Sequence, residues 1–174
     1  MQERAIRKRL NNQSEEVFRW QLAEIGELYL CGAVVTDGME AIRFSSGGVC
    51  RINGAPVILG PVSDLSLIKS AVRLEKLALV CQPLDDLSGL SGHQLLRELS
   101  LAGSTVSDLS ALQDLPSLQT LHLEHTGVRD LRALDAFPNL KTVTVSRDML
   151  PLTWNEYAGF AVVLLQELPE GEIT

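Results

Sequence analysis

The sequence predicts an α/β solenoid, in which short parallel strands stack into one sheet and 3-10 turns return the chain between them. Three observations predict this architecture. A leucine pattern recurs with a period of 22 residues, which lies in the range of repeat proteins. Within each copy, apolar residues first alternate as in a strand and then recur every third residue, which favours a 3-10 turn. Hydrophobic residues make up 45% of the chain but aromatic residues only 5%, so the core must consist mainly of stacked aliphatic layers.

The clearest copy of the pattern spans residues 96–112 and reads L-x-x-L-x-L-x-x-x-x-V-x-D-L-x-x-L. Alternation directs Leu99 and Leu101 to the buried face of the sheet and Ser100 to the opposite, concave face. Further copies of the same frame begin at Ile25, Ile52, Leu74, Leu118 and Leu140. Stacking these copies predicts one column of buried residues from Leu77 through Leu99 and Leu121 to Val143, with the concave face open to solvent.

Two polar positions also recur in the frame. An aspartate precedes the second leucine pair in four copies, as Asp64, Asp86, Asp108 and Asp130. Each carboxylate is placed to accept a hydrogen bond from a backbone N–H two or three residues later, so we assign these residues to capping and not to a metal site. The second position holds Gln82, Ser104, Thr126 and Asp148. Solenoids of this kind often carry asparagine there, so we expect any bridging ladder to be weak or water-assisted.

The frame is least regular between its first two copies. Ile25 and Ile52 are 27 residues apart, five more than the period, which places an insertion near residues 42–51. Turn-forming residues 45–48 and 53–54 separate β-prone residues, and we expect a small strand-turn-strand over residues 42–59 that leads into a degenerate second copy. Such an insertion can carry function, although a structural irregularity is the preferred interpretation.

We expect a single domain over residues 1–174, with about six repeats in residues 25–152 between two caps. Residues 1–24 are expected to form a helical N-terminal cap that includes an amphipathic helix over 3–10. Residues 153–174 are expected to form the C-terminal cap. The apolar run 160–165 is compatible with a strand or a helix, and we favour a final strand that covers the open edge of the sheet.

Residues 74–150 resemble the 22-residue bacterial leucine-rich repeats of the internalin type, through L-x-x-L-x-L followed by V-x-D-L-x-x-L. Residues 5–10 and 22–30 also resemble the N-terminal cap of that family. The resemblance implies a leucine-rich repeat horseshoe with a helical N-terminal cap, in a bacterial protein that binds other proteins. Internalins are secreted, but the charged first twenty residues contain no run that could serve as a signal peptide.

The charge and the cysteine content indicate which partners and which compartment to expect. The formal charge of −7 argues against unspecific nucleic-acid binding and against an anionic membrane surface. Three irregularly spaced cysteines, Cys31, Cys50 and Cys81, are expected to be free thiols in a reducing compartment. We therefore expect a cytoplasmic protein with no membrane-spanning segment.

We find no motif for catalysis, and we expect no cofactor and no metal. The run His122-Leu123-Glu124-His125 is the only cluster with metal-ligand chemistry, but its strand neighbours, such as Ser100 and Thr144, are poor ligands. No Cys–His pairing, phosphate-binding loop or S-x-x-K motif is evident. A hydrolase or metalloenzyme is thus the least favoured class.

We instead expect a non-catalytic module that presents its concave sheet to a protein partner. The alternative is a regulatory or recognition domain of a larger enzyme or of a membrane-anchored protein. The expected binding surface consists of the polar residues on the concave side of the strands: Glu27, Tyr29, Lys76, Glu98, Ser100, Thr120, His122, Glu124, Thr142, Thr144 and Ser146.

Overall fold

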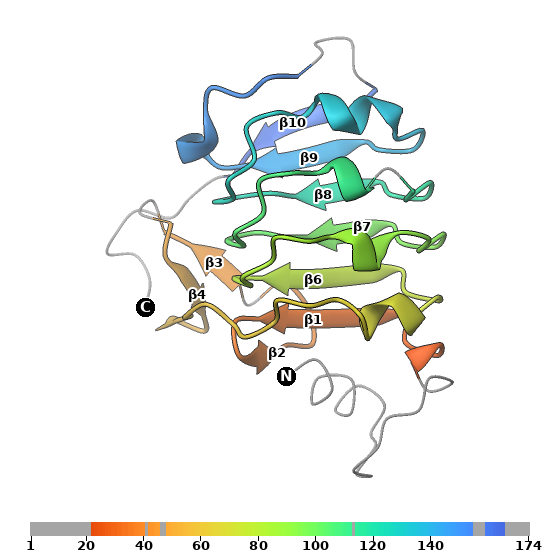
Figure 1. Cartoon of the computed structure of the whole chain (residues 1–174). Helices are drawn as coiled ribbons and strands as arrows, with labels where there is room; N and C mark the ends of the chain where they lie inside the picture. Colours follow the sequence, from red (N-terminus) through yellow and green to blue (C-terminus); the bar gives the residue numbers. More distant parts are fainter. Residues whose placement is uncertain (1–21, 41, 46–47, 113, 155–158, 166–174) are drawn as a thin grey trace.

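A computed structural model describes residues 22–40, 42–45, 48–112, 114–154 and 159–165. Within this part of the chain, seven strands form one sheet in the order β10-β9-β8-β7-β6-β1-β2, and 3-10 turns cover one side of it (Figure 1). The strands are β1 Glu27–Cys31, β2 Val34–Val35, β6 Lys76–Val80, β7 Glu98–Ser100, β8 Thr120–His122, β9 Thr142–Val145 and β10 Ala161–Leu164. The turns are η1 Ile68–Ser70, η2 Ser88–Leu90, η3 Ser110–Leu112, η4 Arg132–Ala136 and η5 Arg147–Met149.

The register of the sheet follows the leucine period. Strands β1, β6, β7, β8, β9 and β10 pair in parallel, and only β2 runs antiparallel to its neighbour β1. Leu77 pairs with Leu99, Leu99 with Leu121, and Leu121 with Val143. All four side chains are at most 1% exposed, which confirms the predicted column and the predicted solenoid.

The recurring aspartates cap the turns as predicted. The backbone N–H of the residue two positions later donates to Asp64, Asp86, Asp108 and Asp130 at 2.8–3.0 Å. In the first three copies this residue is a serine, whose hydroxyl also donates to the second carboxylate oxygen. Each aspartate therefore satisfies a donor that the short turn leaves free.

The second copy of the frame does not join the stack of strands, contrary to the prediction. The copy that begins at Ile52 adds no strand to the stack, because β1 pairs directly with β6, Leu28 opposite Leu77. The strand-turn-strand expected over residues 42–59 is present as a separate antiparallel sheet of β3 Ile42–Phe44, β4 Cys50–Ile52 and β5 Ala55–Pro56, which we call the insert sheet. Asn53 and Gly54 both adopt left-handed backbone angles, with φ of 50° and 81°, and close β4 onto β5 as a hairpin.

Pro56 gives a further reason why this copy leaves the stack, because proline has no N–H for a parallel ladder. Only the second half of the copy keeps its place. Val62, Leu65 and Ile68 are buried in the same core as the regular repeats, although Val57 is not. The insertion is thus longer than the sequence indicated. The residues that follow the insertion complete the first repeat.

The expectation of weak bridging between repeats is wrong at Gln82. Its side chain is fully buried, and its Nε2 donates to the Gly32 carbonyl at 2.8 Å and to the Val80 carbonyl at 3.2 Å. Its Oε1 accepts from the Val62 N–H at 3.1 Å. One amide therefore joins the end of β1, the end of β6 and the segment that returns from the insertion. Among the described residues, the hydroxyl of the equivalent Thr126 bonds within its own repeat: it donates to the Leu123 carbonyl at 2.8 Å and accepts from the Val128 N–H at 3.4 Å.

The two ends are described only in part. The helical cap expected over residues 1–24 lies almost wholly outside the described residues. The strand interpretation of run 160–165 is confirmed, because β10 pairs in parallel with β9 from Ala161 opposite Thr142 to Leu164 opposite Val145. Val163 and Leu164 remain 43% and 47% exposed, so β10 is an outer strand of the sheet.

The insert sheet packs on the concave side of the first strands. It forms a second core, separate from the aliphatic layers, that contains Tyr29, Cys31, Ile42, Phe44, Cys50, Ala78, Val80, Cys81 and Ala102. Tyr29, Cys31, Ala78 and Val80 belong to β1 and β6, whereas Ile42, Phe44 and Cys50 belong to the insert sheet. On the concave face, Tyr29 and Ala78 of β1 and β6 are therefore buried, whereas Thr120, His122, Thr142 and Thr144 of β8 and β9 are partly exposed, and we call the surface around these four residues the open part of the face.

Candidate functional site

The concave side chains lie in rows set by the strand register. The first row runs Glu27, Lys76, Glu98, Thr120, Thr142, and the second runs Tyr29, Ala78, Ser100, His122, Thr144. Glu124 and Ser146 follow two residues after His122 and Thr144, at the carboxyl end of the same face. The eleven predicted residues thus share one face, as the alternation predicts.

Burial divides the predicted residues into two groups. Seven are partly exposed: Glu27, Lys76, Glu98, Thr120, His122, Thr142 and Thr144. Four are buried, contrary to the expectation that they face solvent: Tyr29 at 7% exposure, Ser100 at 1%, Glu124 at 4% and Ser146 at 0%. Tyr29 belongs to the second core under the insert sheet. The Ser146 hydroxyl accepts a hydrogen bond from the His125 N–H at 2.7 Å, which is a structural role.

His122 and Glu124 form a polar pair at the centre of the open part of the face. The His122 Nδ1 lies 3.2 Å from the Glu124 Oε1. Burial alone would lower the pKa of His122, but the bond to Glu124 and the charges of Glu124 and Glu98 outweigh it and raise that pKa. The pair therefore favours a protonated imidazole, 26% exposed, over a carboxylate that is itself 5% exposed. Glu124 sets the charge of this surface without itself being available to a partner.

Two buried polar atoms near this pair have no hydrogen-bond partner in the described part of the chain, the Ser100 hydroxyl and the Glu124 Oε2. Ser100 pairs with His122 across the ladder, so both atoms border the same imidazole. The first row adds an ion pair between Lys76 and Glu27 at 3.7 Å. The open part of the face therefore carries hydroxyls, one imidazole and carboxylates on strands that are joined by backbone hydrogen bonds.

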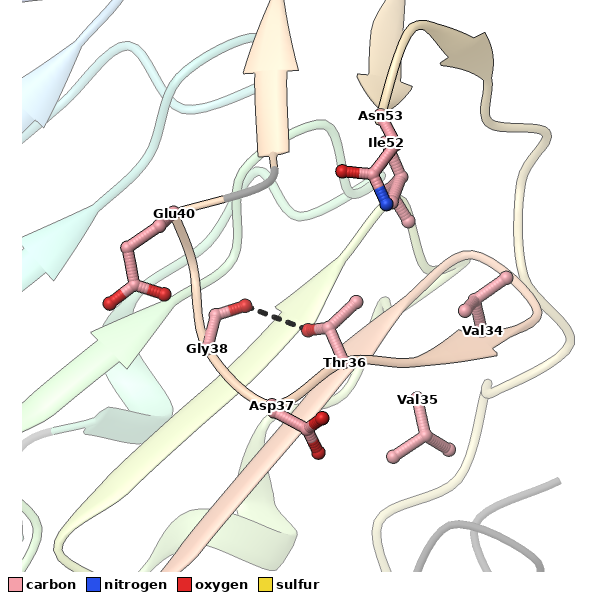
Figure 2. Close-up of a pocket in the computed structure, with 8 residues that line it drawn as sticks. All are labelled: Val34, Val35, Thr36, Asp37, Gly38, Glu40, Ile52 and Asn53. Atoms are coloured by element: carbon pink, nitrogen blue, oxygen red, sulfur yellow. Dashed lines mark hydrogen bonds between the residues drawn. The ribbon is translucent and has the colours of Figure 1, made fainter.

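A pocket of about 400 Å³ lies between β2 and the turn from β4 to β5 (Figure 2). Its lining includes Asp37, Glu40 and Asn53. The Thr36 hydroxyl donates to the Gly38 carbonyl at 2.8 Å and holds the loop that carries the two carboxylates. The sequence analysis did not identify this pocket, because it depends on how the insert sheet is placed beside β2.

The structure also brings the three cysteines together, which sequence reasoning missed. The Cys31 and Cys50 sulfurs lie 3.7 Å apart, and Cys81 belongs to the same buried cluster. All three residues are buried and free of disulfide bonds. The charge of His125 helps to lower the pKa of the Cys81 thiol. His125 in turn pairs with Asp148, with 3.1 Å between Nδ1 and Oδ1.

The repeat frame itself contained the signal for this cluster. Counting 22 residues from Cys81 gives Gly103 and then His125, and all three adopt left-handed backbone angles, with φ of 53°, 65° and 55°. They occupy equivalent turns at the carboxyl ends of β6, β7 and β8. A Cβ at Gly103 would lie 2.9 Å from the Cys81 sulfur and 3.2 Å from the Phe44 ring, so the glycine leaves room for that ring beside the cysteine.

Among residues 22–40, 42–45, 48–112, 114–154 and 159–165, no three side chains of the His, Cys, Asp or Glu type are arranged to hold a metal ion. No helix in the same ranges has the length and apolar character needed to cross a membrane.

Comparison with known proteins yields structural matches only. No protein-family model matches the sequence, and no curated protein is similar to it. Among solved structures, an internalin, InlF, from Listeria monocytogenes is similar over 92% of this chain, with 17% identity and a TM-score of 0.48. The internalin InlC2 from the same species is similar over 93% of this chain and 91% of its own, with 15% identity and a TM-score of 0.43. The chain spans 55% of the length of the InlF chain.

Proposed function

We propose that this protein is a non-catalytic interaction module that binds a protein partner on the open part of its concave sheet, around β7, β8 and β9. The observation that carries the proposal is the arrangement of Glu98, Thr120, His122, Thr142 and Thr144, which are partly exposed on adjacent strands. Because each strand is held by hydrogen bonds from both neighbours, a partner would lose little free energy in ordering this surface.

The insert sheet changes where we place the surface. It covers Tyr29 and the concave side of β1 and β6. The proposed surface therefore excludes Tyr29, and it also excludes Ser100, Glu124 and Ser146 because these side chains are buried. Glu124 retains an indirect role, because its bond to His122 favours a positive charge there. A partner with acidic or hydroxyl groups opposite His122 would be complementary to that charge.

We further propose that residues 1–174 form one domain, with the repeats of 25–152 between two caps, and that it is located in the cytoplasm. One continuous aliphatic core from Leu22 to Leu152 supports the single domain. The three free thiols support a reducing compartment.

The test blocks the open surface without disturbing the core. Thr120 and Thr142 are cross-strand neighbours on that surface, so Thr120→Arg with Thr142→Arg places two bulky charges there. Gln94→Arg, at an exposed position in a turn outside the sheet, is the matched control. Immobilised wild-type protein and both variants are incubated with an extract of the source organism, and retained proteins are identified by quantitative mass spectrometry.

We expect at least one protein to be retained by the wild type and by Gln94→Arg, and to fall at least tenfold with the double arginine variant. Equal unfolding midpoints for the three proteins must accompany this result. A protein retained equally by all three would place binding elsewhere, and the pocket between β2 and the insert sheet is then the next surface to block.

A further inference from the structure

We propose that Cys81, Cys31 and Cys50 form a peroxide-reactive thiol centre, in which Cys81 is the attacking nucleophile and one of the other two thiols closes a disulfide with it. The inference is independent of partner binding. It rests on the convergence of all three cysteines of the chain from the end of β1, from β4 of the insert sheet and from the end of β6. The pairing of β1 with β6 places Cys31 opposite Val80, beside Cys81, and Cys50 joins them because the insert sheet packs on the concave side.

Exposure and charge distinguish the three thiols. Cys81 is 7% exposed, whereas Cys50 is 3% and Cys31 0% exposed, so a small oxidant reaches Cys81 first. The hydrogen bonds from Cys31 and Cys50 lower the pKa of the Cys81 thiol to about 4, and the charge of His125 adds to this against the opposing effect of burial. The hydrogen bonds to Cys31 and to Cys81, together with burial, raise the pKa of Cys50. The directions of these shifts favour a thiolate on Cys81 over a thiolate on Cys50.

The surrounding structure holds the centre in place. His125 is fixed by Asp148 at 3.1 Å and by a ring contact with Phe44 of the insert sheet, with 4.9 Å between the ring centroids. A Cβ at Gly48 would lie 3.1 Å from the His125 Nδ1, so this glycine lets the insert backbone approach the imidazole. Gly48 thus leaves room for the imidazole, and Gly103 leaves room for the Phe44 ring beside the Cys81 sulfur.

The chemistry is balanced with hydrogen peroxide as the oxidant. The Cys81 thiolate attacks one peroxide oxygen, the O–O bond breaks, and the leaving hydroxide takes up a proton to become water. Cys81 is then a sulfenic acid. The sulfur of Cys31 or Cys50 attacks the Cys81 sulfur, its thiol proton goes to the departing oxygen, and a second water leaves as the S–S bond forms. Two thiols lose one electron each, and the peroxide gains two.

The 3.7 Å between the Cys31 and Cys50 sulfurs is longer than the roughly 2.05 Å of a disulfide bond but within contact distance. Cys81 lies in the same buried cluster as these two residues, so either thiol is a candidate to close the bond with it. A bond from Cys81 to Cys50 would tie the insert sheet to β6, whereas a bond from Cys81 to Cys31 would tie β1 to β6. Peptide mapping distinguishes these two products.

The experiment uses the reduced full-length chain. Hydrogen peroxide is added at neutral pH in equimolar amount, with and without dimedone, which traps sulfenic acids. We expect the dimedone adduct on Cys81 and, without dimedone, one disulfide that includes Cys81, with one thiol left per chain. Cys81→Ser should lose both products, and Cys50→Ser is the matched control that keeps the dimedone adduct.

A second measurement needs no variant. The rate of alkylation of each cysteine in the wild type is followed by mass spectrometry between about pH 6 and pH 8. An ordinary thiol with a pKa near 8.5 gains about 70-fold in thiolate over this interval, whereas we expect the Cys81 rate to change less than twofold. The proposal is overturned if Cys81 shows the ordinary rise, or if peroxide leaves Cys81 unmodified or links Cys31 to Cys50 with Cys81 still free.

Discussion

Replacing Gln82 by leucine isolates what its buried amide contributes, because the two side chains have similar volume. The amide bonds three backbone groups: the Gly32 carbonyl, the Val80 carbonyl and the Val62 N–H. Leucine removes all three bonds and leaves no large cavity, so the change in unfolding free energy reports mainly on hydrogen bonding.

The magnitude follows from which groups lose their only partner. The Val80 carbonyl keeps a bond from the Gly32 N–H at 2.9 Å, so it stays satisfied. The Gly32 carbonyl and the Val62 N–H have no other bond among the described residues. A buried polar group left unsatisfied costs about 1–3 kcal/mol, and leucine regains some hydrophobic burial, so we expect Gln82→Leu to destabilise the protein by about 2–4 kcal/mol.

Urea unfolding followed by circular dichroism measures this free energy, with the slope against urea compared between variants. Ser104→Ala is the matched control, because Ser104 occupies the same position one repeat later, is 4% exposed, and its hydroxyl has no partner in the described part of the chain. We expect this control to change stability by less than about 0.5 kcal/mol. A Gln82→Leu variant as stable as wild type, or a Ser104→Ala variant equally destabilised, would refute the bridging role of the amide.

Three other changes test the core, the open face and the turns. Leu121→Ala should cost about 2–5 kcal/mol in urea unfolding, because Leu121 is fully buried between two layers; a loss below about 1 kcal/mol would contradict layer packing. The pKa of His122 is higher in the folded protein than its ordinary value of 6.5. Its contribution to stability is therefore fully present below pH 6.5 and is lost as the pH rises through the pKa of the folded state. His122→Asn should therefore remove part of the decline in stability between about pH 6 and pH 8, and an unchanged pH profile would argue against the ion pair with Glu124. The pKa of Asp130 is lowered to about 2 by Arg132, and hydrogen bonds from Ser66, Ser88 and Ser110 lower those of Asp64, Asp86 and Asp108. The four aspartates contribute stability above their ordinary pKa of 3.8, and this contribution is lost as the pH falls toward their lower pKa values in the folded protein. Replacing all four by asparagine should therefore flatten the acid side of the curve of stability against pH. A curve as steep as that of the wild type would show that other groups dominate.

The sequence by itself determined the parts of this protein whose interactions are local or repeat with the chain. The period of 22 residues placed Leu77, Leu99, Leu121 and Val143 in one buried column, because alternation and stacking leave no other register that buries both strand leucines. The aspartate caps could be read in the same way, since each carboxylate bonds a backbone N–H only two residues away. The same frame aligned Cys81, Gly103 and His125, although their contact was not recognised from it.

Only the tertiary structure decided which part of the concave face is open. The sequence placed Tyr29, Ser100, Glu124 and Ser146 on that face correctly, but alternation says nothing of what packs on the far side of a sheet. The insert sheet joins residues of β4 to residues of β1 and β6, and this packing covers Tyr29 and gathers the three thiols. Neither contact has a periodic or local signature, because each depends on how a loop without repeat character folds back onto the solenoid. The physical reason is that burial on the concave side is a long-range property, whereas the leucine frame encodes only the contacts between neighbouring turns.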